Sequence, residues 1–185
     1  MALSLSLADE NHERNRLRAT AAEDPSERIK QCIAFLFTIA SIEVVNTVKN
    51  GHGDTCYTIN VVLIDASAQQ KIVGGATETT SFQIERTAKE FKTMHYAVTH
   101  WASKPASDDC SYCRYFRHCS VPGTLARLVG SKAKLEERVR EFLNGYVFHA
   151  RLPRPTGCLC QGFEHIPSIV TRFIAKDLPQ TESAV

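Results

Sequence analysis

The chain has no apolar run long enough to cross a membrane. Its longest apolar stretch, Ile33–Ala40, is far shorter than the ~20 residues that a transmembrane helix needs. We therefore expect a protein that does not span a bilayer, although it can still lie against one. The apolar start Met1–Leu7 is short, has no basic lead-in and runs directly into Asp9 and Glu10, so it does not have the pattern of a secretion signal.

An excess of charge of one sign is also missing, because 22 basic residues nearly balance 20 acidic ones. A general nucleic-acid-binding protein would carry a clear basic excess. The sequence also has no glycine-rich phosphate-binding loop, no His-Glu-x-x-His motif and no grouping of a nucleophile with histidine and aspartate. We therefore do not expect an enzyme.

What the sequence does have is enough apolar residues for a folded core: 43% of 185 residues, which is typical of one domain with tails. Residues 1–27 are polar without a sustained apolar stripe and are predicted to be a disordered tail. We place the domain at 28–176 and a second tail at 177–185. Seven cysteines without a secretion signal indicate a reducing, cytoplasmic compartment, where clustered cysteines bind metal or stay as thiols.

Three short strands are predicted in sequence. Residues 28–49 are β-rich, the segment 50–54 (Asn-Gly-His-Gly-Asp) is a strong turn signal, and a second strand covers 57–65. A third strand begins at Ser81. Strands joined by such turns form an antiparallel meander, so we predict an α+β fold in which a three-stranded antiparallel meander packs against a helical subdomain.

The third strand is predicted to turn directly into a helix. Residues 82–85 alternate between apolar and polar side chains, and from Ala88 the apolar residues recur at steps of three and four until about Ala102. Thr87 can cap this helix, with Glu90 completing a capping box. Arg86 therefore lies beside a helix N-terminus, where free backbone N–H groups and a nearby cation favour an anion.

Two further helices are predicted beyond a polar insertion at 103–121. Ser131 can cap a second long helix, which Pro153 and Pro155 end. A last helix covers roughly 167–176.

The insertion contains the sharpest chemical signal. Cys110 and Cys113 have the spacing that lets two thiolates reach one tetrahedral zinc ion. If the two long helices pack antiparallel, the loop that holds Cys158 and Cys160 returns to the loop that holds Cys110. A structural zinc would then staple the insertion. The expected ligands are Cys110, Cys113, Cys158 and Cys160, with His118 and Cys119 as alternates.

Other interpretations of these cysteines stay open. The thiols can be unliganded, or Cys110 and Cys113 can be a redox pair, although such a pair normally follows a strand and here follows a polar linker. Cys32 and Cys56 are expected to be small buried hydrophobic residues. The aromatic residues of the insertion either dock on a membrane together with its arginines or cover the cysteine site. The aromatic residues are Tyr112, Tyr115 and Phe116, and the arginines are Arg114 and Arg117.

The order of these elements resembles a phox-homology (PX) domain over residues 28–176. The chain is most similar to the divergent PX-like proteins of oomycetes, which carry a Cys-x-x-Cys insertion before the proline loop. The resemblance depends on the order and spacing of its segments. The matching segments are Phe82–Phe91, Val121–Gly123, Arg138–Leu143 and Ile166–Phe173.

The resemblance implies a phosphoinositide-binding module that attaches peripherally to membranes, with phosphatidylinositol 3-phosphate as the expected lipid. In this family, an arginine at the end of the third strand holds the 3-phosphate through charge-assisted hydrogen bonds. The resemblance also implies a cytoplasmic protein on endosomal-type membranes, with protein partners and no nucleic acid. The residues expected at the lipid site are Arg86, Lys89, Arg127, Lys132, Lys134 and Arg138.

The chain departs from the family pattern at this lipid site. Counting back from Phe91, Ala88 takes the position of the aromatic residue that stacks on the inositol ring, and Thr87 takes the position of the arginine. Arg86 lies one residue early, and can equally be a solvated cation that pairs with a neighbouring glutamate. An alternative function follows: a PX-shaped protein-interaction domain with a degenerate lipid pocket, stapled by a structural zinc.

Overall fold

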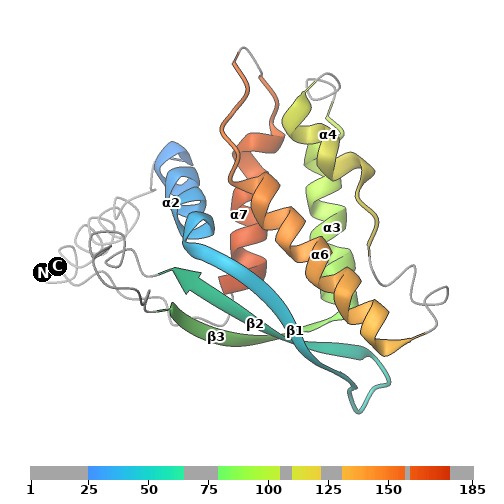
Figure 1. The fold of residues 1–185 in the computed structure, drawn as a ribbon. Helices are drawn as coiled ribbons and strands as arrows, with labels where there is room; N and C mark the ends of the chain where they lie inside the picture. The colour runs from blue at the N-terminus through green and yellow to red at the C-terminus, as the bar shows by residue number, and fades with distance from the viewer. Residues whose placement is uncertain (1–24, 65–78, 105–109, 122–130, 157–158, 176–185) are drawn as a thin grey trace, which may run out of the picture.

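The computed structural model describes residues 25–64, 79–104, 110–121, 131–156 and 159–175. Over these residues the protein has the predicted α+β architecture, in which a three-stranded antiparallel sheet packs against a layer of helices (Figure 1). The predicted tails lie outside the described residues, except that residues 25–27 already belong to helix α2 (Pro25–Thr38). None of the described helices combines the length and the apolar composition that crossing a bilayer requires.

The sheet is the predicted meander. Strand β1 (Ile39–Lys49) pairs with β2 (Thr55–Ile64), and β2 pairs with β3 (Thr79–Thr87), both antiparallel. The central strand buries alternate residues of one face, which is the period-2 pattern of a sheet covered on one side. The helices cover this face (Figure 1).

A tight turn joins β1 to β2 where the sequence predicts one. The Asn50 side chain accepts hydrogen bonds from the backbone N–H groups of His52 and Asp54, at 3.0 and 2.9 Å. Gly53 has a φ of 81°, a left-handed conformation that glycine adopts without steric cost. The turn chemistry therefore fixes the register of the hairpin.

The segment before β1 is a helix, and the expectation that the chain is β-rich from residue 28 is wrong there. Helix α2 (Pro25–Thr38) places Ile29, Cys32, Ile33 and Leu36 toward the interior, at helical steps of three and four. The apolar, β-branched residues near its end imitate a strand when they are considered alone. Packing of α2 against the last helix of the chain decides in favour of the helix.

The switch from strand to helix at Thr87 is confirmed. Thr87 is the N-cap of α3 (Ala88–Ala102), its hydroxyl accepts from the Glu90 backbone N–H at 3.2 Å, and the Glu90 carboxylate accepts from the Thr87 N–H at 2.8 Å. This reciprocal capping box fixes where the strand ends. It also fixes the position of Arg86 as the last strand residue before the cap.

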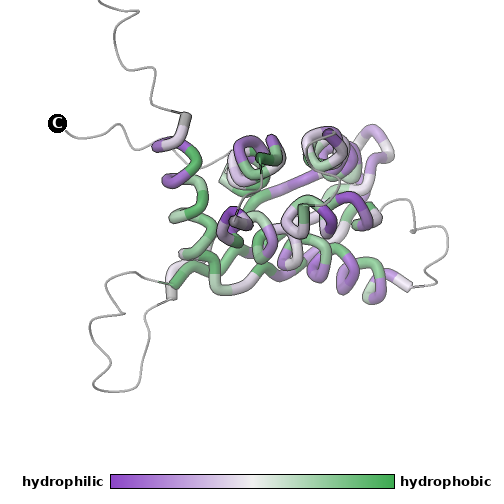
Figure 2. The backbone as a smooth tube through the Cα atoms, turned by 90° about the horizontal axis from the view of Figure 1, so that it is seen from above, coloured by the Kyte–Doolittle hydropathy of each residue, from purple (hydrophilic) through white to green (hydrophobic). Residues whose placement is uncertain are grey.

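Within the described residues, three more helices follow α3. The insertion contains a short helix, α4 (Ser111–His118), that the sequence analysis did not predict. Helix α6 (Lys132–Ala150) is capped by Ser131, as predicted, and α7 (Gly162–Ala175) begins five residues earlier than expected, with Pro167 inside it. Figure 2 shows hydrophobic and hydrophilic residues alternating along the helices, as expected for helices that each bury one face.

Helices α3 and α6 run in the same direction. Phe91 contacts Phe142 with ring centroids 6.1 Å apart, and one turn later His95 Nδ1 forms a hydrogen bond with the Tyr146 hydroxyl. The antiparallel packing that was the condition for the four-cysteine site is therefore not found. Both helices begin near the sheet, since α3 follows β3 directly and Lys132 at the start of α6 contacts Asn46 of β1. Helix α6 then runs alongside β1 (Figure 1).

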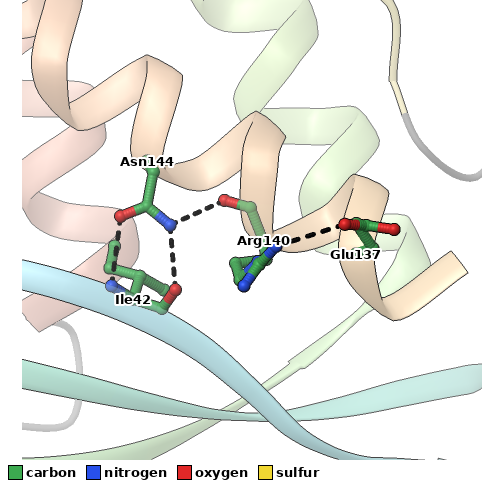
Figure 3. A network of polar contacts seen from close by, with 4 residues as sticks. All are labelled: Ile42, Glu137, Arg140 and Asn144. Atoms are coloured by element: carbon green, nitrogen blue, oxygen red, sulfur yellow. Dashed lines mark hydrogen bonds and ion pairs between the residues drawn. The ribbon is translucent and has the colours of Figure 1, made fainter. Parts of the chain in front are cut away.

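A side-chain amide joins α6 to the sheet. Asn144 donates a hydrogen bond from Nδ2 to the Ile42 carbonyl at 2.8 Å, and its Oδ1 accepts from the Ile42 N–H at 3.1 Å (Figure 3). The same amide also donates to the Arg140 carbonyl one turn back. Strand β1 lies at the edge of the sheet, so Asn144 pairs backbone groups there that have no neighbouring strand.

We predict that Asn144→Ala lowers the free energy of unfolding by about 1–3 kcal/mol, because it leaves both Ile42 backbone groups without this partner. Urea unfolding followed by circular dichroism measures the change. Glu137→Ala is the matched control, because it removes an exposed pair with Arg140 (3.3 Å) that contributes at most ~1 kcal/mol. Equal losses in the two variants would contradict the role of Asn144.

Candidate metal centre

Two cysteines of the insertion lie at the start of α4. Cys110 is the N-cap residue of this helix, and its carbonyl accepts from the Arg114 N–H at 3.0 Å. Cys113 lies three residues on, one turn along the same helical face, so the two side chains converge. The free N–H groups of a helix N-terminus also favour ionised thiolates. The local fold of the Cys-x-x-Cys segment therefore creates a paired-sulfur site.

A third cysteine joins this pair from a distant segment. Cys160 precedes α7, and its sulfur lies 3.4 Å from that of Cys110, which is 50 residues away in the sequence. The Sγ atoms of Cys110, Cys113 and Cys160 all lie within 4.8 Å of one another. No disulfide joins any cysteine in the described part of the chain. These three thiols form a cluster that could hold a metal ion.

The cysteine cluster is buried. Cys110 is 5% exposed, and Cys113 and Cys160 are both 0% exposed. Burying several ionised thiolates without a counter-charge would be costly, and a divalent cation removes this cost because it neutralises them. The donor set of converging sulfur atoms suits a thiophilic metal.

A glycine allows α7 to approach the cluster. A Cβ atom at Gly162 would lie 2.6 Å from Cys113 Sγ and 3.2 Å from Ile166 Cδ1. It would also lie 3.7 Å from the Trp101 carbonyl at the end of α3. The missing side chain at Gly162 therefore lets α3, α4 and α7 meet at one point beside the sulfur atoms.

One aromatic ring of the insertion, that of Tyr112, lies beside the cluster. Tyr112 is buried against Phe116 and Phe163, with ring centroids 5.5 Å apart in both cases. Its hydroxyl donates to the Ala150 carbonyl at the end of α6. Burial raises the pKa of Tyr112 well above its usual value, and the neighbouring thiols raise it further, so the hydroxyl keeps its proton. The rings therefore belong to the core beside the cysteines.

The alternate metal ligands do not join the cluster among the described residues. His118 is exposed at the end of α4, and Cys119 is half-buried beside Tyr115. Cys158, the predicted fourth ligand, lies outside the described residues. Cys32 and Cys56 are half-buried and separate from the cluster. The structure thus brings together three of the four predicted cysteines.

The predicted lipid ligand Arg86 is buried, with 2% of its surface exposed. Its Nε donates to the Phe173 carbonyl of α7 at 2.8 Å, and its Nη1 donates to the Glu85 carbonyl at 2.7 Å. The guanidinium also lies over the Phe173 ring, 5.4 Å from the centroid. The alternative interpretation of Arg86 as a solvated surface cation is wrong, because the side chain joins β3 to α7 inside the protein.

The other predicted lipid ligands lie on the surface or outside the described residues. Lys89 is exposed at the start of α3, and Lys132, Lys134 and Arg138 are exposed on α6. Lys132 forms an ion pair with Glu136, at 3.7 Å within the same helix. Arg127 lies outside the described residues.

The role of Gly162 and the helix α4 were not predicted from the sequence. A glycine directly after Cys-Leu-Cys-Gln was visible, but its role depends on the approach of Cys113 from a distant segment. Buried aromatic residues at positions 112 and 116, four apart, were the available signal for α4.

A comparison of the chain with models of known protein families, with curated proteins and with solved structures finds no match. The PX resemblance therefore stays a prediction.

We predict that Gly162→Ala destabilises the protein by about 1–3 kcal/mol, the usual cost of forcing an extra methyl group into a packed site. The methyl group must displace Cys113 Sγ or the start of α7. Gly51→Ala is the control, since a Cβ atom there meets nothing within 4 Å. Chemical unfolding of both variants checks the prediction, and an unchanged Gly162→Ala protein would contradict the close approach.

We predict that Arg86→Met destabilises the protein by about 2–4 kcal/mol, because the Phe173 and Glu85 carbonyls lose a charged donor in the interior. Arg138→Met, an exposed arginine of α6, should change stability by less than about 0.5 kcal/mol. Urea denaturation compares the two variants. A fully stable Arg86→Met protein would show that the side chain does not join β3 to α7.

Proposed function

We propose that this chain is a zinc-stapled protein-interaction domain. One observation carries the proposal: three buried cysteine sulfurs from two distant segments lie within 4.8 Å of one another. A cluster of this kind is better explained by a shared ligand than by three separate packing roles. Cys110, Cys113 and Cys160 would hold the ion, and Cys158 stays the predicted fourth ligand.

Zinc is the metal that fits this donor set best. Thiolates bind zinc at about 2.3 Å in tetrahedral geometry, which separates two ligand sulfurs by about 3.8 Å. The sulfurs of Cys110 and Cys160 are 3.4 Å apart, and all three sulfurs lie within 4.8 Å of one another. Small adjustments of these distances would bring them to the zinc value. An all-cysteine, buried site is typical of structural zinc, whereas catalytic zinc keeps an open position for water. We therefore propose a structural ion and no catalytic role.

The proposed zinc would hold the helical layer together. It would link the N-terminus of α4 to the segment that leads into α7, at the point where α3 also ends. Binding of a structural metal contributes directly to the free energy of folding. A small insertion with few apolar residues would thereby become a rigid part of a surface that can bind a partner.

The surroundings of Arg86 support the protein-interaction domain with a degenerate lipid pocket over the lipid-binding module. A headgroup ligand must present its guanidinium to solvent, and Arg86 is 2% exposed and bonded to main-chain carbonyls. Ala88 also supplies no ring for the inositol. Phosphatidylinositol 3-phosphate binding on endosomal-type membranes thus stays a prediction from the resemblance, and we propose the protein-interaction domain in its place.

We predict that the purified chain, refolded with zinc, contains about one zinc ion per molecule, and that Cys113→Ser and Cys160→Ser abolish this binding. Chelation should lower the thermal unfolding midpoint by roughly 6–12 °C, which corresponds to about 3 kcal/mol in a chain of this size. Elemental analysis and calorimetry make these measurements. The same analysis of Cys158→Ser tests the fourth ligand.

Cys32→Ser is the matched control, because Cys32 lies on α2 away from the cluster and should leave the zinc content unchanged. A metal-free protein with reactive thiols after reconstitution would instead favour redox chemistry. Sedimentation with vesicles that contain phosphatidylinositol 3-phosphate separates the two binding functions. Specific vesicle binding that is lost in Lys134→Glu/Arg138→Glu, with folding intact, would favour the lipid module.

A further inference from the structure

A cleft of about 950 Å³ lies between α2 and α7, with residues of α3 also lining it. Helix α7 packs against both α2 and α3. The cleft lies beside these packed helices. On α7 it extends from Phe163 to Arg172, a rise of about 13 Å, or two and a half turns. None of the predicted metal or lipid ligands lines it.

The lining of this cleft combines apolar and cationic side chains. Apolar side chains come from all three helices, namely Ile29 and Ile33 of α2, Ala97 and Trp101 of α3, and Phe163 and Ile169 of α7. Four cations line it as well: Arg28 and Lys30 on α2, Arg172 on α7, and Arg154 from the segment before α7. Glu164 is the single acidic residue in this lining.

Two of these cations have no partner within the described part of the chain. Arg154 lies 3.9 Å from Glu164, and Lys30 lies 3.3 Å from Glu27. For the exposed Arg28 and Arg172, neither an ion pair nor a hydrogen bond is found among the described residues. The two arginines come from α2 and α7, so both helices that border the cleft present unneutralised positive charge.

His165 adds an aromatic surface and no charge. Its ring stacks on Trp101 with centroids 3.5 Å apart. Burial lowers the pKa of His165, an effect that Glu164 opposes in part, so the ring is neutral at pH 7. The ligand that fits the cleft therefore needs an apolar face for the rings and isoleucines and acidic groups for the arginines.

We propose that this cleft binds an amphipathic acidic helix of a partner protein. An amphipathic helix places apolar residues at i, i+3, i+4 and i+7 into such a groove. Asp and Glu residues on its two flanks would then meet Arg28 and Lys30 on one side and Arg154 and Arg172 on the other. Complementary charge of this kind determines which partner binds and in which orientation.

The inference rests on the proposed interaction function and names the chemistry of the partner. The cleft lies close to the metal centre, because Phe163 and His165 belong to the first turn of α7, which begins two residues after Cys160. The nearby contact between Gly162 and the end of α3 fixes the position of Trp101 relative to this turn.

The test uses the full-length, zinc-loaded chain as bait for a displayed library of random 16-residue peptides. Selected peptides are expected to carry apolar residues at helical spacing with Asp or Glu beside them. Their affinity should fall at least about tenfold for Arg28→Glu/Arg172→Glu, because two attractive contacts become repulsive. A peptide in which Lys replaces the acidic residues should regain binding to that double variant.

Lys49→Glu/Lys92→Glu is the matched control, since it reverses two exposed cations, on β1 and α3, that do not line the cleft, and it should change affinity less than twofold. Selection of neutral or basic peptides, or equal loss in both double variants, would overturn the proposal. Displacement of the peptide by inorganic phosphate alone would assign the cleft to a small anion instead. A dimer that Arg28→Glu/Arg172→Glu dissociates in sedimentation velocity would assign it to a second copy of the chain.

Zinc content is measured on every variant in this series. A chain that holds zinc but selects no acidic helix would disprove the cleft assignment and leave the zinc-stapled domain standing. A chain without zinc that still selects acidic helices would disprove the staple and leave the cleft assignment standing.

Discussion

The convergence of three cysteine sulfurs beside Gly162 constrains the rest of the helical layer. At this point the start of α4, the end of α3 and the start of α7 approach one another closely enough that a single methyl group would not fit. The aromatic residues of α4 then pack against α6 and α7, and Tyr112 bonds to the last carbonyl of α6. An irregular insertion is thereby incorporated into the core.

Polar side chains connect the helices to the sheet. Arg86 donates to a carbonyl of α7 from the end of β3, and Asn144 bonds to both backbone groups of Ile42 on β1. Buried donors and acceptors must be paired, so each of these contacts allows one relative position of helix and sheet. Helix α7, which borders the cleft, is therefore held at its start beside the cysteine cluster and near its end by Arg86.

The same residue types have different roles according to their burial. Arg86 lies in the interior and has main-chain acceptors, whereas Arg28 and Arg172 lie in an open cleft. An arginine in the interior contributes to the fold, and an arginine in a cleft is available to a ligand. For this reason the anion-binding surface that we infer is at the opposite end of α3 from the residue that the family resemblance suggested.

The sequence by itself determined the elements whose signals are local. The Asn50–Asp54 turn, the capping box of Thr87 and Glu90, the Ser131 cap and the three-stranded meander all depend on neighbouring residues, so they could be predicted. The pairing of Cys110 and Cys113 also follows from their spacing on one helix. Tertiary structure decided that Cys160 joins them, that Arg86 is buried and that α2 is a helix, because each outcome depends on contacts with segments far away in the chain. Helix α3 and helix α6 run in the same direction for a similar reason: their relative orientation depends on which rings pack together in the core, and no local pattern records that choice.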